Sequence, residues 1–212
     1  MASNKKLKIL CIHGYRQDAE SFRSKLGSLR KSTKSTAEYT FLTAPLAVNG
    51  NEKERGWWFS RDDRSFDAQE QSDVSVGLDE SLKLVSDIVE KEGPFDGILG
   101  FSQGASFVAL VLQLGNKLRG EFDQVRFRFA ILFCGFQSRN SKHSFGGKID
   151  LPTLHVVGTT DKVIPLEQAT AFEDLFTNLT RCEHEGGHFI PSSGESKKEV
   201  IKFLKKFSEE PE

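Results

Sequence analysis

The pentapeptide GFSQG places Ser102 between Gly100 and Gly104. An apolar run, 96–101, precedes the serine, and a segment of helical character, 105–118, follows it. A sharp strand-to-helix turn holds a serine in a strained conformation with its hydroxyl exposed above a sheet, and a Cβ at either glycine would crowd that turn. We therefore interpret Ser102 as a nucleophile. The alternative is an ordinary glycine-rich turn.

A serine hydroxyl needs a neighbouring base before it can attack a carbonyl carbon. In hydrolases with a strand–turn–helix nucleophile, the acid follows the serine in the chain and a histidine follows the acid. His188 comes after a glycine pair, just beyond the candidate strand 180–186, where a loop can bring an imidazole over Ser102. His184 is the alternative, although a place inside that strand would fix its side chain on one face of the sheet. The other histidines lie too early in the chain or in a polar loop: His13, His143 and His155.

The acid of such a site should follow a strand that lies between the serine and the histidine. Asp161 meets this condition because it stands in a turn directly after the apolar run 151–158. Its carboxylate would hold one tautomer of the histidine and stabilise the imidazolium that forms. The alternative role of Asp161 is to cap a helix that begins near Pro165, but four residues separate the two. The other aspartates considered stand before a strand or on a helix: Asp96, Asp150 and Asp174.

Two backbone amides are expected to bind the oxyanion of the reaction. The first is the amide of Gln103, which follows the nucleophile at the N-terminus of a helix. The second should come from the loop after the first strand, CIHGYRQ, where we assign it to Tyr15. Gly14 lets this loop turn close to the serine. His13 is expected to support the loop by hydrogen bonding and not to act as the base.

Strand-like and helix-like segments alternate along the chain and predict a single α/β domain over residues 1–212. Short apolar runs separated by amphipathic helices form βαβ units, so we expect a mainly parallel sheet of about six strands with helices on both faces. Ligands bind at the carboxyl ends of the strands in such sheets. The expected strands are 7–12, 39–44, 96–101, 128–136, 151–158 and 180–186, and the expected helices are 18–32, 76–93, 105–118, 165–176 and 196–210.

The segment 45–75 has no clear period and is predicted to be a lid-like insertion. A loop of this length in a compact domain is usually functional or disordered, and the paired Trp57 and Trp58 argue against disorder. We expect aromatic side chains to form an apolar wall of the substrate pocket. The alternative is that the tryptophans only fix the loop to the core. The candidate pocket residues are Trp57, Trp58, Phe101, Phe136 and Phe189.

Composition narrows the class of protein. The 212 residues carry 29 Lys and Arg against 30 Asp and Glu, a net charge of -1, which argues against a nucleic-acid partner. No window reaches the roughly 18 apolar residues of a membrane span, and the apolar run after the first lysines is too short for a signal peptide. Three cysteines are interpreted as reduced packing residues of a cytoplasmic protein. No zinc spacing or phosphate-binding loop is present, so we expect no metal, no cofactor and no obligate protein partner.

Several blocks of the chain together resemble one known family. They are LCIHGYRQ, RGWWF, GPFDGILGFSQGA, LPTLHVVGTTDKVIP and HEGGHFIP, and they span about residues 8–203. The chain resembles the FSH family of serine hydrolases in the α/β-hydrolase superfamily, closest to the ovarian-cancer-associated esterase branch. This resemblance implies a compact α/β-hydrolase fold with a Ser-Asp-His triad. The triad would fall on Ser102, Asp161 and His188, the residues that the spacing also selects.

The function expected from these features is that of a serine carboxylesterase. It would hydrolyse small-molecule acyl esters through an acyl-enzyme intermediate. Because some fungal members of the family act on thioesters, an acyl-thioesterase or protein deacylase with the same residues is an open alternative. A non-catalytic ligand-binding protein and a peptidase are weaker alternatives.

Overall fold

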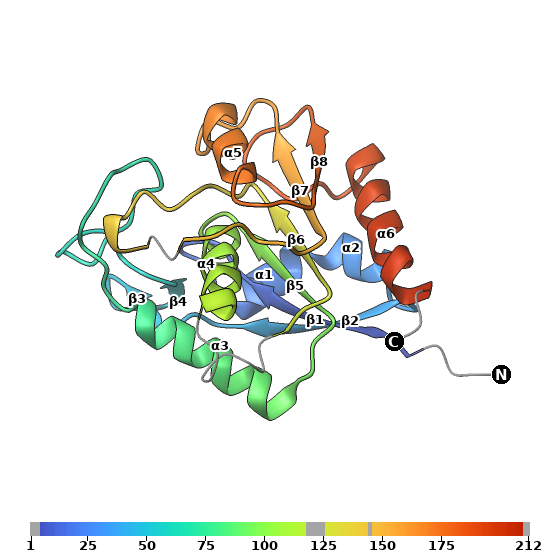
Figure 1. Ribbon diagram of the computed structural model, residues 1–212, viewed down its shortest axis with the longest axis horizontal. Helices are drawn as coiled ribbons and strands as arrows, with labels where there is room; N and C mark the ends of the chain where they lie inside the picture. The colour runs from blue at the N-terminus through green and yellow to red at the C-terminus, as the bar shows by residue number, and fades with distance from the viewer. Residues whose placement is uncertain (1–4, 118–125, 144–145, 210–212) are drawn as a thin grey trace.

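The six expected strand segments form one parallel sheet (Figure 1). The structure is a computed structural model that describes residues 5–117, 126–143 and 146–209. Its strands stand in the order β2-β1-β5-β6-β7-β8, and each neighbouring pair is parallel. The strands are β1 (Leu7–Ile12), β2 (Ala37–Leu42), β5 (Gly97–Phe101), β6 (Phe129–Phe133), β7 (Thr153–Gly158) and β8 (Leu179–His184). The predicted α/β class and the mainly parallel sheet of about six strands are therefore confirmed.

Helices cover both faces of the sheet. Successive side chains of a strand point to opposite faces, so Leu10 and Ile12 of β1 enter one apolar cluster while Ile9 and Cys11 enter the other. The first cluster takes side chains from α3, α4 and α5, and the second takes them from α1, α2 and α6. The helices are α1 (Ala19–Lys25), α2 (Gly27–Ser32), α3 (Leu78–Glu92), α4 (Gln103–Lys117), α5 (Leu166–Glu173) and α6 (Gly194–Glu209).

Two elements differ from the sequence-based expectation. The single helix expected over 18–32 is two helices that meet at Leu26, where Gly27, a poor helix former, follows. The segment 45–75 contains a hairpin of β3 (Leu46–Val48) and β4 (Asn51–Gly56). This hairpin escaped detection because β3 has three residues and the sequence of β4, NEKERG, lacks an apolar alternation.

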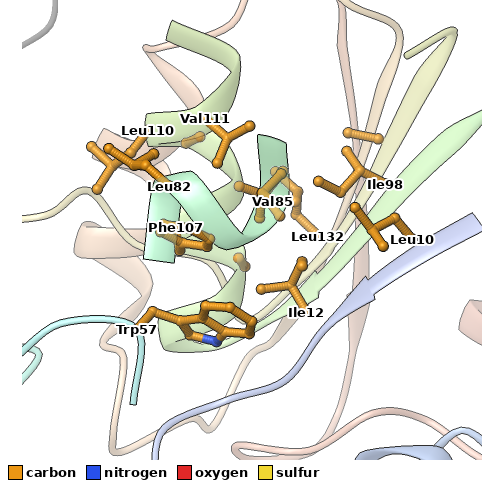
Figure 2. Packing of buried hydrophobic residues seen from close by; sticks show 14 of the residues in the cluster. Leu10, Ile12, Trp57, Leu82, Val85, Ile98, Phe107, Leu110, Val111 and Leu132 are labelled. Atoms are coloured by element: carbon orange, nitrogen blue, oxygen red, sulfur yellow. The ribbon is translucent and has the colours of Figure 1, made fainter. Parts of the chain in front are cut away.

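The apolar core between the sheet and the first group of helices also receives the indole of Trp57. Figure 2 shows this ring beside Phe107 of α4 and close to Ile12 of β1. The two aromatic rings are stacked, with centroids 4.8 Å apart and planes inclined by 10°. The segment after the hairpin is therefore anchored in the core by a large buried ring. No helix in the described part of the chain is long and apolar enough to span a bilayer.

Candidate active site

Ser102 stands at the turn between β5 and α4. Its φ angle of 52° lies in the left-handed region, which costs a residue with a side chain free energy and is typical of functional sites. A Cβ at Gly100 would lie 2.7 Å from the Cα of Ala105, and a Cβ at Gly104 would overlap the carbonyl oxygen of His13. The amide of Ser102 donates to the carbonyl of β6 residue Phe133 at 2.9 Å. Both glycines thus allow the tight crossing that the sequence predicted.

Asp161 follows β7 in a turn that fixes its carboxylate. Oδ1 accepts hydrogen bonds from the amides of Val163 at 2.8 Å and Ile164 at 2.9 Å, and the side chain is only 3% exposed. The carboxylate thus orders the turn before α5 and leaves its second oxygen for another partner. A Cβ at Gly158 would overlap the backbone of the loop after β8, so a glycine is needed where the two loops meet.

His188 connects Asp161 to Ser102. Its Nδ1 lies 2.7 Å from Oδ2 of Asp161, and its Nε2 lies 2.9 Å from Oγ of Ser102. Because an ionised carboxylate only accepts hydrogen bonds, Nδ1 carries the proton and Nε2 can accept the serine proton. The structure therefore brings together all three residues of the predicted triad.

His184, the alternative base, is the last residue of β8. Its Nε2 is buried without a hydrogen-bond partner among the described residues, and burial lowers the pKa of its imidazole. The ring packs against Phe189 with centroids 4.8 Å apart. His184 thus has the fixed position in the strand that the sequence suggested, and the hydrogen bond to Ser102 belongs to His188.

The two amides expected to bind an oxyanion come from the loop after β1 and from the start of α4. The described residues provide no hydrogen-bond acceptor for the amides of Tyr15 and Gln103. His13 is fully buried, accepts from the amide of Ala44 at 3.0 Å through Nε2, and donates through Nδ1 to the carbonyl of Gly14 at 2.7 Å. Burial lowers the pKa of His13 to about 4, so it remains neutral and supports the loop.

Cys134 lies beside the triad at the end of β6. Its Sγ, a carboxylate oxygen of Asp161 and a ring nitrogen of His188 lie within 4.8 Å of one another. Burial raises the pKa of the thiol, so it stays protonated and is a poor nucleophile. The other two groups are already bonded to each other, so the cluster offers no free set of ligands for a metal ion.

Four of the five aromatic residues expected in a substrate pocket are buried, and three of them are almost completely inaccessible. Trp57 is 0% exposed and Trp58 and Phe136 are 1% exposed. Trp58 packs edge-on against Phe66 and His143, at centroid distances of 5.2 and 5.3 Å. The expectation that Trp57 lines a pocket needs correction, because its indole hydrogen bond and its stacking hold the ring inside the core.

The other two candidate pocket residues lie beside His188. The ring of Phe101 is 5.0 Å from the imidazole of His188, and it is 4% exposed. Phe189, the next residue in the chain, is 50% exposed. Phe101 therefore packs against the imidazole in the interior, and the side chain of Phe189 leaves apolar surface exposed.

A cavity of about 1170 Å³ lies against α4. Its described lining includes Ser106, Gln113, Phe136 and His143, and contains no member of the triad. The Oγ of Ser106 is buried one helical turn after Ser102 and has no described partner. Phe136 thus faces a cavity that is separate from the hydrogen-bonded chain of the triad.

Comparison with known protein families shows to which family this chain belongs. The family model described as "Serine hydrolase (FSH1)" matches residues 1–200. The chain belongs to this serine hydrolase family. Its FSH-family relatives include Esterase OVCA2 of Danio rerio, 42% identical over 224 residues, with 95% of this chain and 97% of the relative covered. Esterase OVCA2 of Homo sapiens is 38% identical over 229 residues, with 99% and 100% covered.

Solved structures share the fold at low sequence identity. Esterase PE8 has a TM-score of 0.69 at 19% identity, with 95% of this chain and 92% of that chain covered. SOBER1 of Arabidopsis thaliana has a TM-score of 0.63 at 18% identity, with 95% and 99% covered. Acyl-protein thioesterase 2 of Zea mays has a TM-score of 0.64 at 18% identity, with 96% and 94% covered. These likenesses place the FSH-family chain in the α/β-hydrolase fold, and its family makes it a hydrolase.

Proposed function

We propose that this protein is a carboxylesterase that cleaves small acyl esters with Ser102, His188 and Asp161. The observation that carries the proposal is the continuous hydrogen-bonded chain from serine to carboxylate, 2.9 and 2.7 Å in its two links. The serine also stands at a strained turn between a strand and a helix, the position of the nucleophile in hydrolases with a strand–turn–helix nucleophile. The esterase names of the FSH-family relatives support the same reaction.

The reaction begins when the Oγ of Ser102 attacks the acyl carbon of the ester. Nε2 of His188 takes the hydroxyl proton, and the carboxylate of Asp161 stabilises the resulting imidazolium. The negative charge on the former carbonyl oxygen is stabilised by the amides of Tyr15 and Gln103. His188 then returns the proton to the alcohol that leaves, and an acyl-enzyme remains. Attack by water, with His188 again as base, releases the acid and restores the serine.

Two serines that lie one helical turn apart give a matched test. Ser102→Ala removes the nucleophile, and Ser106→Ala removes a buried hydroxyl one turn later that has no described hydrogen-bond partner. We expect Ser102→Ala to lose at least ~10³-fold in kcat and all labelling by a fluorophosphonate. Ser106→Ala should keep both within a few-fold. Ester hydrolysis by a folded Ser102→Ala protein at the parental rate would refute the assignment.

The same protein can be used to distinguish oxygen esters from thioesters as its substrates. Oxygen and sulfur esters that share one acyl group differ only in the leaving group, so their kcat/KM ratio distinguishes a carboxylesterase from an acyl-thioesterase or deacylase. A chain that binds acyl esters without turnover or fluorophosphonate labelling would be a ligand-binding protein. The three buried free cysteines fit the reducing cytoplasm, which we propose as the compartment.

A further inference from the structure

Two successive peptide units of the loop after β1 are each held by a buried side chain. The indole Nε1 of Trp57 donates to the carbonyl of His13 at 2.7 Å, which holds the unit between His13 and Gly14. The imidazole Nδ1 of His13 donates to the carbonyl of Gly14 at 2.7 Å, which holds the next unit. Because a peptide unit is planar, holding the Gly14 carbonyl also orients the amide of Tyr15.

Trp57 is itself fixed on several sides. Its ring is stacked on Phe107 of α4, and Figure 2 shows the ring inside the apolar cluster. Its carbonyl accepts from the hydroxyl of Ser81 on α3 at 2.6 Å. The indole nitrogen thus reaches the loop from a rigid support.

The same residue is also tied to the other expected oxyanion donor. The side chain of Gln103 accepts from the amide of Trp57 at 3.0 Å and donates to the carbonyl of Trp58 at 2.8 Å. The backbone amide of Gln103 is the expected donor at the start of α4. Trp57 therefore contacts the loop that carries one donor and the residue that carries the other.

The hairpin before Trp57 strengthens this arrangement. The amide of Arg16 donates to the carbonyl of Arg55 in β4 at 2.8 Å, and the amide of Arg55 donates to the carbonyl of Gln17 at 3.0 Å. Residues 55–57 are thus hydrogen-bonded to the loop in three places. This part of the segment 45–75 is a support for the loop.

We propose that Trp57 is a positioning residue that pre-organises the oxyanion hole. This inference rests on the proposed esterase function. Donors that already point at the developing charge need no reorientation during the reaction, and such pre-organisation acts mainly on the chemical step. Without the indole N–H, the His13 carbonyl loses its partner and the amide of Tyr15 is less firmly aimed.

The test compares Trp57→Phe with Tyr39→Phe. Both variants remove one side-chain hydrogen bond from an aromatic residue, but the hydroxyl of Tyr39 is bonded to Thr33 at 2.8 Å, beside the edge strand β2, and not to the loop after β1. We expect Trp57→Phe to lower kcat about tenfold, less than the roughly 10²–10³-fold loss of a whole oxyanion donor, with KM within twofold. Its affinity for a trifluoromethyl ketone, whose adduct places an oxyanion in the hole, should fall in parallel. Tyr39→Phe should keep both values within twofold.

An isosteric benzothienylalanine at position 57 keeps the ring shape and removes only the N–H, so it serves if the phenylalanine variant fails to fold. A folded variant at position 57 with unchanged kcat and unchanged ketone affinity would overturn the proposal. So would a rise in KM alone, or an equal loss of kcat in Tyr39→Phe. Failure of the esterase function itself would look different, because the parent chain would then show no fluorophosphonate label at Ser102.

Discussion

The carboxylate of Asp161 makes three hydrogen bonds that an asparagine cannot all keep. Oδ1 accepts from the amides of Val163 and Ile164, and Oδ2 faces Nδ1 of His188 at 2.7 Å. The amide of Asp161→Asn has one acceptor oxygen and one donor nitrogen. If the oxygen stays with the two backbone amides, the NH₂ group faces Nδ1 of His188. The imidazole must then place its proton on Nε2, and it can no longer take the proton of Ser102.

The opposite orientation of the asparagine would preserve the useful tautomer but leave two backbone N–H groups facing an NH₂ group. Each buried unsatisfied group costs about 1–3 kcal/mol, so this orientation is disfavoured by about 2–6 kcal/mol. At about 1.4 kcal/mol per tenfold in rate, the deficit corresponds to a loss of roughly 30- to 10⁴-fold. An asparagine that enforces the wrong tautomer in a serine protease costs about 10⁴-fold. We therefore expect a loss of about 10³–10⁴-fold in kcat.

The assay is steady-state hydrolysis of a chromogenic acyl ester at pH 7.5, with circular dichroism to verify folding. Asp150→Asn is the matched control, because it makes the same chemical change at a carboxylate that accepts from the hydroxyl of Thr177 outside the site. The control should keep parental activity. If folded Asp161→Asn kept kcat within tenfold of the parent, the tautomer argument would be refuted.

Two further predictions concern histidines. His188→Ala should lose at least ~10³-fold in kcat because base and nucleophile act as a unit. His184→Ala should remain within a few-fold of the parent in the same ester assay. The opposite ranking of the two variants would assign the base to His184. Burial lowers the pKa of His143 from 6.5 to about 4, so between these values the unfolded chain binds the proton more readily than the folded chain. Above pH 6.5 this difference has no effect on the free energy of unfolding. As the pH falls from 6.5 toward 4, proton binding to the unfolded chain lowers the free energy of unfolding. In urea unfolding between pH 7 and 5, His143→Gln should reduce the pH slope of the unfolding free energy by about 1 kcal/mol per pH unit, and identical slopes in both proteins would contradict this.

The order of the candidate nucleophile, acid and base along the chain could be predicted from the sequence. Ser102 and Asp161 each follow an apolar run and His188 follows a candidate strand, and these segments are β5, β7 and β8 of one parallel sheet. Because the carboxyl ends of parallel strands lie at one edge, residues 59 and 27 positions apart were expected to meet there. The glycines that flank Ser102 belong to the same kind of local information, since the turn they allow involves neighbouring residues.

The role of Trp57 depended on the tertiary structure. Its aromatic neighbour in sequence and the charged residues around it suggested the wall of a pocket, but the ring is fully buried. Its three hydrogen-bond partners, His13, Ser81 and Gln103, lie 24 to 46 residues away along the chain. The sequence of the segment 45–75 could not reveal these partners, because the hairpin that precedes Trp57 has no alternation of apolar and polar residues.

The sequence by itself thus determined the fold class and pointed to Ser102, Asp161 and one of two histidines near the last strand as candidate catalytic residues, because apolar runs, turn glycines and chain order are local signals. The tertiary structure decided which histidine reaches the serine and which side chains hold the loop after β1. His184 and His188 are only four residues apart, and the end of β8 between them sends one ring into a packed position and the other toward Ser102. The hydrogen bonds of Trp57 depend on the packing of β1, α3 and α4, because the partners of Trp57 lie in or directly after these distant elements.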